Sequence, residues 1–172
     1  MNKIDIRKSM LHLRNRLSEE DVMLKSQTIT TLIKNDTHYQ HAKCVALFYP
    51  MGHEVNLLSL LTDQKQFCFP KVEKDGIHFY QTSNFSTFKK SSFGVLEPTE
   101  GVRCDEDIDY MLVPALAISD DYYRVGYGKG YYDAFLIKHR PNHVVGVIYD
   151  FQRMPHFEYH NHDQKVDRIF WG

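Results

Sequence analysis

Short apolar runs alternate with helix-type segments along most of this 172-residue chain, and that alternation limits the fold more than any other feature. Residues 44–49 are apolar at every position and stop at Pro50, as expected for a strand buried on both faces. Residues 66–70, 109–118 and 144–149 are further predicted strands. Strands that alternate with helices favour an α/β layered fold with a mainly parallel central sheet.

Two helices are predicted before the first strand. An apolar stripe at helical spacing defines the first helix and consists of Ile6, Met10, Leu13 and Leu17. The basic side chains of this helix share another face and are Lys3, Arg7 and Arg14. Ser18 and Asp21 have the spacing of a capping box and predict the start of the second helix.

The remaining predicted elements are shorter. Residues 54–61 are typical of a short helix that turns Leu57, Leu58 and Leu61 inward. Asp75 and Gly76 mark a turn between two strands. The other expected elements are strands at 77–81 and 166–171, a helix at 131–139 and a long loop at 82–106. No repeat or linker divides the chain, so residues 1–172 are predicted to form a single domain.

Charge and cysteine content argue against several classes of protein. Lys and Arg total 21 against 22 Asp and Glu, which disfavours a broad basic face for nucleic acid. The longest apolar stretch, residues 111–118, is far too short to cross a bilayer, and the charged amino-terminal residues do not resemble a signal peptide. Cys44, Cys68 and Cys104 are far apart in the sequence, which implies neither a disulfide framework nor a zinc site and suits a reducing cytoplasm.

Residues 120–133 carry the most informative pattern. They follow a predicted buried strand and open a predicted helix, the place where open α/β sheets concentrate binding sites. Alternating glycines here let the backbone turn tightly and present N–H groups to an anion; they are Gly126, Gly128 and Gly130. The spacing matches neither a Walker loop nor a Rossmann fingerprint, and it fits a plain turn as well as a phosphate loop. The positive charges of Arg124 and Lys129 favour the phosphate loop over the plain turn.

Two sets of candidate metal ligands leave alternatives open. Asp133 suits either an acid that stabilises a helix dipole or a Mg²⁺ ligand. His156, His160 and His162 lie close to Asp163 in the sequence and suggest transition-metal ligation. Because this segment is typical of a loop, helical ligand spacing is not assured, and we expect most of these histidines at the surface.

The run R-x-G-x-G-x-G-Y-Y-D, from Arg124 to Asp133, resembles the signature of 5-formyltetrahydrofolate cyclo-ligases. Further segments that resemble this family follow its order along nearly the whole chain, at residues 3–7, 48–55, 69–72, 94–98, 113–117 and 162–167. One position differs, because the family commonly has glycine where this chain has Tyr123. That difference puts the geometry of the turn in question.

The resemblance implies an enzyme of phosphosugar-isomerase/CoA-transferase-like architecture. Members convert 5-formyltetrahydrofolate to 5,10-methenyltetrahydrofolate and split ATP to ADP and phosphate with Mg²⁺. ATP is needed because the formyl oxygen leaves poorly until it is phosphorylated, so the protein mainly positions groups and neutralises charge. The expected partners are these small molecules, with no nucleic acid and no membrane, and a monomer is favoured over a weak dimer.

The resemblance also implies roles for individual residues. ATP would contact Lys3, Arg7, Arg124, Gly126, Tyr127, Gly128, Lys129, Gly130, Tyr131 and Tyr132. Arg124 and Lys129 would be catalytic by stabilising the transferred charge. Folate would contact Tyr49, Glu54 and Tyr132, and Mg²⁺ would bind Asp133 and Asp163. Phe93 is a candidate wall for the pterin, and residues 82–106 form a candidate lid.

Judged without the resemblance, the same side chains have plainer explanations. Lys3, Arg7 and Asp163 are typical of solvated charges, Glu54 of a helix-start acid and Tyr49 of packing. Two other functions therefore stay open beside the enzyme. One is a folate- or nucleotide-binding module without turnover, and the other is a phosphosugar isomerase or CoA-transferase-like enzyme that needs no ATP.

Overall fold

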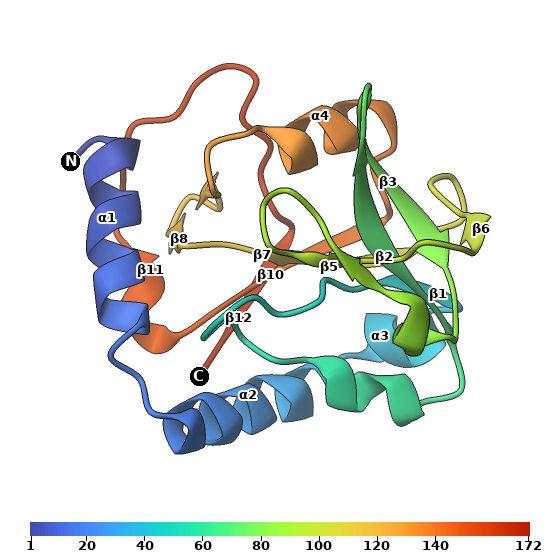
Figure 1. Cartoon of the computed structure of the whole chain (residues 1–172). Helices are drawn as coiled ribbons and strands as arrows, with labels where there is room; N and C mark the ends of the chain where they lie inside the picture. The colour runs from blue at the N-terminus through green and yellow to red at the C-terminus, as the bar shows by residue number, and fades with distance from the viewer.

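A seven-stranded sheet crosses the molecule in the computed structural model, which describes residues 1–172 (Figure 1). Its strand order is β12-β10-β7-β1-β2-β3-β6. These strands span Cys44–Ala46 (β1), Gln66–Glu73 (β2), Gly76–Gln81 (β3), Val102–Arg103 (β6), Tyr110–Pro114 (β7), His143–Ile148 (β10) and Arg168–Trp171 (β12). Neighbours from β12 to β2 are parallel, and β3 and β6 are antiparallel at one edge. The predicted α/β fold with a mainly parallel sheet is confirmed.

Helices cover both faces of this sheet (Figure 1). The covering helices are α2 (Glu19–Lys34) and α3 (Thr37–His41) on one face and α4 (Tyr131–Lys138) on the other. The side chains of β7 alternate accordingly. Tyr110 and Leu112 join the core cluster that includes α2, whereas Met111 and Val113 join the cluster that includes α4. Burial on both faces explains why the inner strands are continuous apolar runs.

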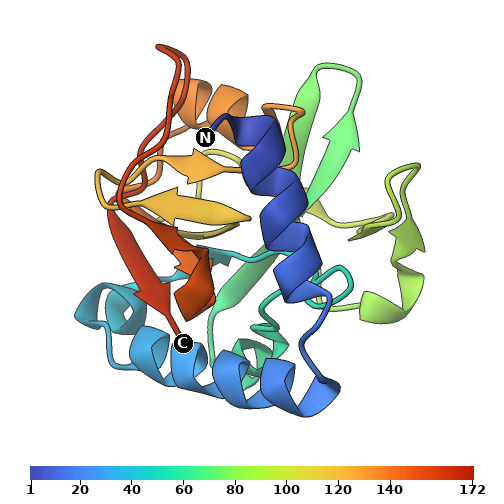
Figure 2. The same cartoon turned by 90° about the vertical axis from the view of Figure 1, so that its left-hand side faces the viewer.

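The first helix, α1 (Lys3–Arg14), packs beside the main sheet and over a second, smaller sheet (Figure 2). The smaller sheet consists of β8 (Ala117–Ser119), β9 (Arg124–Val125) and β11 (Arg153–Met154). Ile6 and Met10 are buried against Leu116, Ala117 and Val125. This sheet was not predicted, and it fixes the start of the glycine-containing segment next to α1.

Both N-terminal helices form, with one change in the buried face of α1. The predicted capping box at the start of α2 is present with both of its hydrogen bonds. In α1 the buried side chains are Ile6, Met10 and Arg14, and Leu13 is 38% exposed. Residues four apart lie on one line of a helix, so the buried line that starts at Ile6 continues to position 14.

Two predicted elements take another form. Residues 109–118 are not one strand, because β7 ends at Pro114, which has no N–H to continue a ladder, and β8 belongs to the smaller sheet. Residues 54–61 do not form an α-helix, and only the 3₁₀ turn η1 (Leu58–Thr62) is present. The Glu54 carboxylate accepts the Met51 N–H instead, at 2.8 Å.

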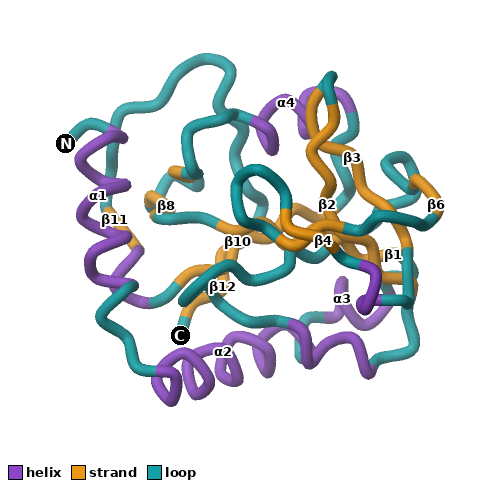
Figure 3. Tube along the Cα trace, in the orientation of Figure 1, coloured by secondary structure: helices purple, strands orange, loops and turns teal.

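Much of the chain that lies between α1 and α4 is loop (Figure 3). The predicted long loop, residues 82–106, contains short elements, namely η2 (Phe85–Thr87), β4 (Lys89–Lys90), β5 (Leu96–Glu97) and β6. A last 3₁₀ turn, η3 (Asp150–Gln152), precedes β11. No helix of the structure combines the length and apolar character needed to cross a bilayer.

Candidate functional site

A cavity of about 630 Å³ opens between α1, the glycine-containing segment, the start of α4 and the β2–β3 hairpin. Every residue expected to bind ATP, folate or Mg²⁺ lines it: Lys3, Arg7, Tyr49, Glu54, Arg124, Gly126, Tyr127, Gly128, Lys129, Gly130, Tyr131, Tyr132, Asp133 and Asp163. Phe93, His160 and His162 also line it. The fold therefore gathers segments from both ends of the chain around one space.

The glycine-containing segment is held against α1 by Arg7. The Arg7 Nε–H donates to the Gly126 carbonyl at 2.8 Å. A Cβ on Gly126 would lie 2.8 Å from an Arg124 guanidinium nitrogen, which is closer than real side chains pack. Gly128 has φ +100°, a conformation that residues with a side chain rarely adopt. A Cβ added there would lie 3.5 Å from the Arg7 Cζ, which is an ordinary contact distance. Gly126 therefore allows Arg124 to approach the backbone closely, whereas Gly128 allows the left-handed backbone conformation.

Arg124 is a buried cation with incomplete pairing. Its guanidinium donates to the Pro114 carbonyl at 3.3 Å and lies 3.8 Å from the Asp133 carboxylate and 5.1 Å from the Tyr132 ring centroid. Its Nε has no hydrogen-bond partner. Burial lowers the pKa of Arg124 and opposes its charge. A buried cation with unused hydrogen-bonding capacity at a cavity wall is suited to an anionic ligand.

Two carboxylates on the cavity wall each keep an oxygen free. Asp163 Oδ2 accepts from the Lys3 ammonium and from the His160 N–H, and Asp133 Oδ1 accepts from the Gln164 N–H at 3.1 Å. Burial raises the pKa of Asp163, but the His160 N–H and Lys3 outweigh it, so this pKa lies below its ordinary value. The remaining oxygens accept no hydrogen bond, and carboxylate oxygens of this kind are ligands that Mg²⁺ takes beside phosphates.

Glu54 lies at another part of the cavity and is almost fully buried. Its two oxygens accept from the Tyr127 hydroxyl and from the Met51 N–H. Burial raises the pKa of Glu54, and Arg14, with a nitrogen 4.0 Å from the carboxylate, opposes that rise. The surrounding wall is mainly apolar and includes Phe48, Tyr49, Met51, Pro70, Val72, Ile77 and Val95. A buried acceptor in an apolar wall suits a flat ligand with N–H donors.

Arg14 was not predicted as part of this region. It is 4% exposed, it lies 5.7 Å from the Tyr127 ring centroid, and its Nε has no hydrogen-bond partner. The sequence analysis placed it on a basic stripe with Lys3 and Arg7. Its position four residues after the buried Met10 was the available signal.

Lys129 and Phe93 meet at the exposed side of the cavity. The Lys129 ammonium lies 5.4 Å from the Phe93 ring centroid, and that ring lies 6.3 Å from the Tyr131 ring. Phe93 is 45% exposed and comes from the long 82–106 segment, which also contributes Ser91, Val95 and Glu97 to the cavity lining. This segment thus reaches the glycine-containing segment.

The histidines do not form a metal centre. His160 and His162 stack with their ring centroids 5.5 Å apart, whereas His156 lies 3.4 Å from Asp121, away from the cavity. None of the three belongs to a group of ligating side chains close enough to share an ion. The side chains of His156 and His162 are 66% and 70% exposed, as expected.

Tyr123, which replaces the glycine common in the family, is accommodated by packing. Its ring stacks on Tyr159 at 3.8 Å between centroids, and the Lys165 ammonium lies 5.1 Å from it. The positive φ in this turn, +73°, belongs to Tyr122. The neighbouring residue therefore adopts the left-handed conformation, and Arg124 still enters β9.

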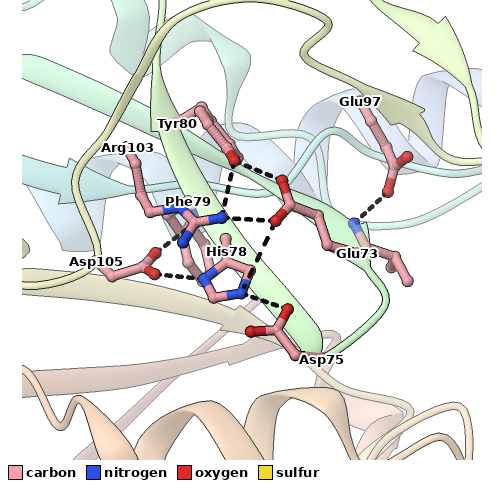
Figure 4. Close-up of polar contacts among 9 residues, drawn as sticks. Glu73, Asp75, His78, Phe79, Tyr80, Glu97, Arg103 and Asp105 are labelled. Carbon is pink, nitrogen blue, oxygen red and sulfur yellow. Dashed lines mark hydrogen bonds and ion pairs between the residues drawn. The ribbon is translucent and has the colours of Figure 1, made fainter.

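A second polar cluster lies at the β2–β3 hairpin (Figure 4). We call it the hairpin network; it consists of Glu73, Asp75, His78, Tyr80, Arg103 and Asp105. Asp105 accepts from the Phe79 N–H at 2.7 Å and contacts His78 Nδ1 at 2.6 Å. His78 Nε2 lies 2.8 Å from Asp75, and Glu73 accepts from Arg103 at 2.6 Å and from Tyr80. Asp105, and then Asp75, raises the pKa of His78.

Comparisons with known proteins identify the family of the chain. The family model described as "5-formyltetrahydrofolate cyclo-ligase family" matches residues 1–172. The solved 5,10-methenyltetrahydrofolate synthetase of Aquifex aeolicus is 35% identical with a TM-score of 0.88, covering 99% of this chain and 90% of its own. The synthetase from Mycoplasma pneumoniae is 28% identical with a TM-score of 0.78, covering 98% of both chains. A mouse 5-formyltetrahydrofolate cyclo-ligase is 26% identical over 90% of this chain and 86% of its own length. The chain belongs to the 5-formyltetrahydrofolate cyclo-ligase family.

Proposed function

We propose that this protein converts 5-formyltetrahydrofolate to 5,10-methenyltetrahydrofolate with ATP and Mg²⁺, releasing ADP and phosphate. The observation that carries the proposal is the single cavity that joins an anion-binding part, around Arg124 and Lys129, to a buried acceptor, Glu54. Family membership supports the folate reaction. The cavity supports the use of two ligands of different chemistry side by side.

The chemistry requires the formyl oxygen to become a leaving group. The terminal phosphoryl group of ATP is transferred to that oxygen, and ADP departs. The second folate nitrogen then attacks the formyl carbon and closes the ring, and the oxygen leaves as phosphate. No protein nucleophile takes part, so the protein's work is to position two ligands and to neutralise moving charge.

The phosphates would lie along the glycine-containing segment. Arg124 offers an unpaired Nε, and Arg7 already holds the backbone of this segment. Lys129 is exposed and bonded to no carboxylate, so it can follow the phosphoryl group as charge moves. Gly126 to Tyr132 complete the expected ATP site, with Lys3 released from Asp163 to reach a phosphate. Asp133 and Asp163 would hold Mg²⁺, which supplies charge neutralisation at the phosphate oxygens.

The folate would bind between Tyr49, Tyr132 and Glu54. The pterin ring carries N–H groups, and an ionised Glu54 accepts hydrogen bonds from them. The Tyr127 hydroxyl and the Met51 N–H already donate to this carboxylate, which fixes its oxygens in the wall. Pro70, Val72 and Ile77 supply apolar surface for the rest of the ring.

A direct assay tests the proposal. Purified protein is mixed with 5-formyltetrahydrofolate and ATP, and the absorbance of the methenyl product is followed with and without a chelator. We expect product only when ATP and Mg²⁺ are both present, with one ADP per product. Folate binding without ATP hydrolysis would indicate a binding module, and turnover of a sugar phosphate without nucleotide would indicate an isomerase-like enzyme. We also propose a monomeric, cytoplasmic protein, which sedimentation and cell fractionation test.

A further inference from the structure

All three cysteines of the chain meet inside the core. Cys44 starts β1, Cys68 lies in β2, and Cys104 directly follows β6. Their three Sγ atoms all lie within 4.8 Å of one another. Each is a free thiol, and each is at most 4% exposed. The distances along the sequence gave no sign of this three-thiol cluster.

The strands of the main sheet hold the cluster in place. β1 and β2 are parallel neighbours with Ala46 opposite Cys68, so Cys44 and Cys68 belong to the same core cluster. The Cys104 N–H donates to the Phe79 carbonyl at 2.9 Å, which ties it to β3. The three sulfur atoms thus sit on three separate backbone segments that the sheet already fixes, and a ligand would find them arranged in advance.

Apolar packing alone does not require three thiols at one point. One buried cysteine acts as a small hydrophobic side chain, and Ala or Val serves the same purpose. The sulfur atoms make weak contacts with backbone carbonyls, Cys68 to Val45 at 3.6 Å and Cys104 to Phe79 at 3.5 Å. Converging thiols instead form a donor set that selects soft, thiophilic ions.

The side chains around the three thiols determine which net charge a bound ion can have. The thiols pack among apolar side chains that include Ala46, Ile77 and Phe79, and the charged group that acts on Cys104 is the Asp105 carboxylate, which is negative. Three thiolates around a divalent ion would leave one negative charge, which is costly to bury without a cation. Three thiolates around a trivalent ion give a neutral complex, which the apolar core tolerates. The three-thiol cluster therefore suits a trivalent ion that takes three ligands.

We propose that Cys44, Cys68 and Cys104 form a binding site for a trivalent thiophilic ion, for which arsenic(III) is the probe. Arsenous acid would form three As–S bonds while its three As–O bonds break. Each thiol proton joins a departing hydroxide, so three water molecules leave. No oxidation state changes, so no oxidant is required.

The test uses the full chain, reduced with a phosphine that carries no thiol. The protein is incubated with arsenite near its unfolding midpoint, cooled and desalted, so that burial does not prevent access. We expect native mass spectrometry to show one arsenic gained for three hydrogens lost. We also expect the unfolding midpoint to rise, because a ligand of the native state stabilises it.

Variants separate a three-thiol site from simpler thiol chemistry. Cys44→Ala, Cys68→Ala and Cys104→Ala each leave two thiols and should hold arsenic at least about tenfold more weakly against a competing dithiol. Val113→Ala removes a side chain from the same core cluster and keeps all thiols, so it should bind like the original protein. No retained arsenic, a lower unfolding midpoint, or a single-cysteine variant that binds as tightly as the original protein would overturn the proposal.

Discussion

The cavity and the hairpin network both bring charged side chains together, but they differ in how many of those charges have a hydrogen-bond or ion-pair partner. In the hairpin network, His78 is bonded through both ring nitrogens, and Glu73 receives Arg103 and Tyr80 (Figure 4). At the cavity, the Nε of Arg124 is buried without a hydrogen-bond partner. The Nε of Arg14 is also unpartnered, but Arg14 lies behind the cavity wall, against Glu54 and Tyr127. A buried charged group that lacks a hydrogen-bond partner destabilises the fold. Such a group is therefore expected where a bound ligand supplies the missing partner.

This difference indicates which cluster acts on a ligand and which one supports the fold. Arg124 approaches Asp133 only to 3.8 Å, and Lys129 pairs with no acid. Each of the hairpin acids, by contrast, has a donor within hydrogen-bond distance. Substitutions at the cavity should therefore change catalysis, and substitutions in the hairpin network should change stability.

The largest expected effect is that of Lys129→Ala. Removing a cation that stabilises the transferred phosphoryl group should lower kcat by about 10²–10³-fold. Lys129 is exposed and bonded to no carboxylate, so the unfolding temperature should stay the same. Steady-state kinetics and thermal unfolding measure both quantities. Lys90→Ala removes an exposed lysine of β4 as the matched control, and a Lys129→Ala protein with ordinary kcat contradicts the assigned role.

Glu54→Gln tests the other part of the cavity. Replacing an ionised acceptor by a neutral amide should weaken folate binding by about 1.5–3 kcal/mol, or roughly 10–100-fold in KM. The KM for ATP should not change. Glu97→Gln is the control, because Glu97 also lines the cavity but accepts from the Val72 N–H. Equal KM changes for both substrates would mean that Glu54 supports the whole site rather than the folate.

Arg14→Met examines how Glu54 keeps its charge. Burial raises the pKa of Glu54, and Arg14 counteracts that rise, so losing Arg14 should raise this pKa further. Folate affinity is lost as the pH falls through the pKa of Glu54, so in the variant the loss should begin at a higher pH. Profiles of folate KM against pH measure the shift, with thermal unfolding as a check on folding. Arg16→Met, at an exposed position of the same N-terminal region, should leave the profile unchanged.

The main sheet was predictable because its signals are local, and the cavity lining was predictable through family motifs. Residues 44–49 and 144–149 show double-sided burial in their own composition. Three features depend instead on packing between distant segments: the burial of Arg14, the smaller sheet and the three-thiol cluster. A periodic pattern gives the direction of a side chain on its own helix, but it does not give what covers that face. The change of sheet after Pro114 likewise depends on β9 and β11, which lie later in the chain.

The smallest expected effect, a change in stability of less than about 1 kcal/mol, lies in the hairpin network. Asp105 and Asp75 raise the pKa of His78 above its ordinary value of 6.5, so the native state holds that proton more tightly than the unfolded chain. This contribution is complete below 6.5 and is lost as the pH rises through the native pKa of His78. His78→Gln should therefore lower the free energy of unfolding in mild acid and have a smaller effect in base, with kcat unchanged.

Denaturant unfolding at several pH values measures this dependence, and His139→Gln is the matched control because His139 lies outside the hairpin network, at the end of α4. A His78→Gln protein that loses catalytic activity while keeping its stability would reverse the assignment of the two clusters. The hairpin network would then act on a ligand, even though every one of its charges is already paired within the fold.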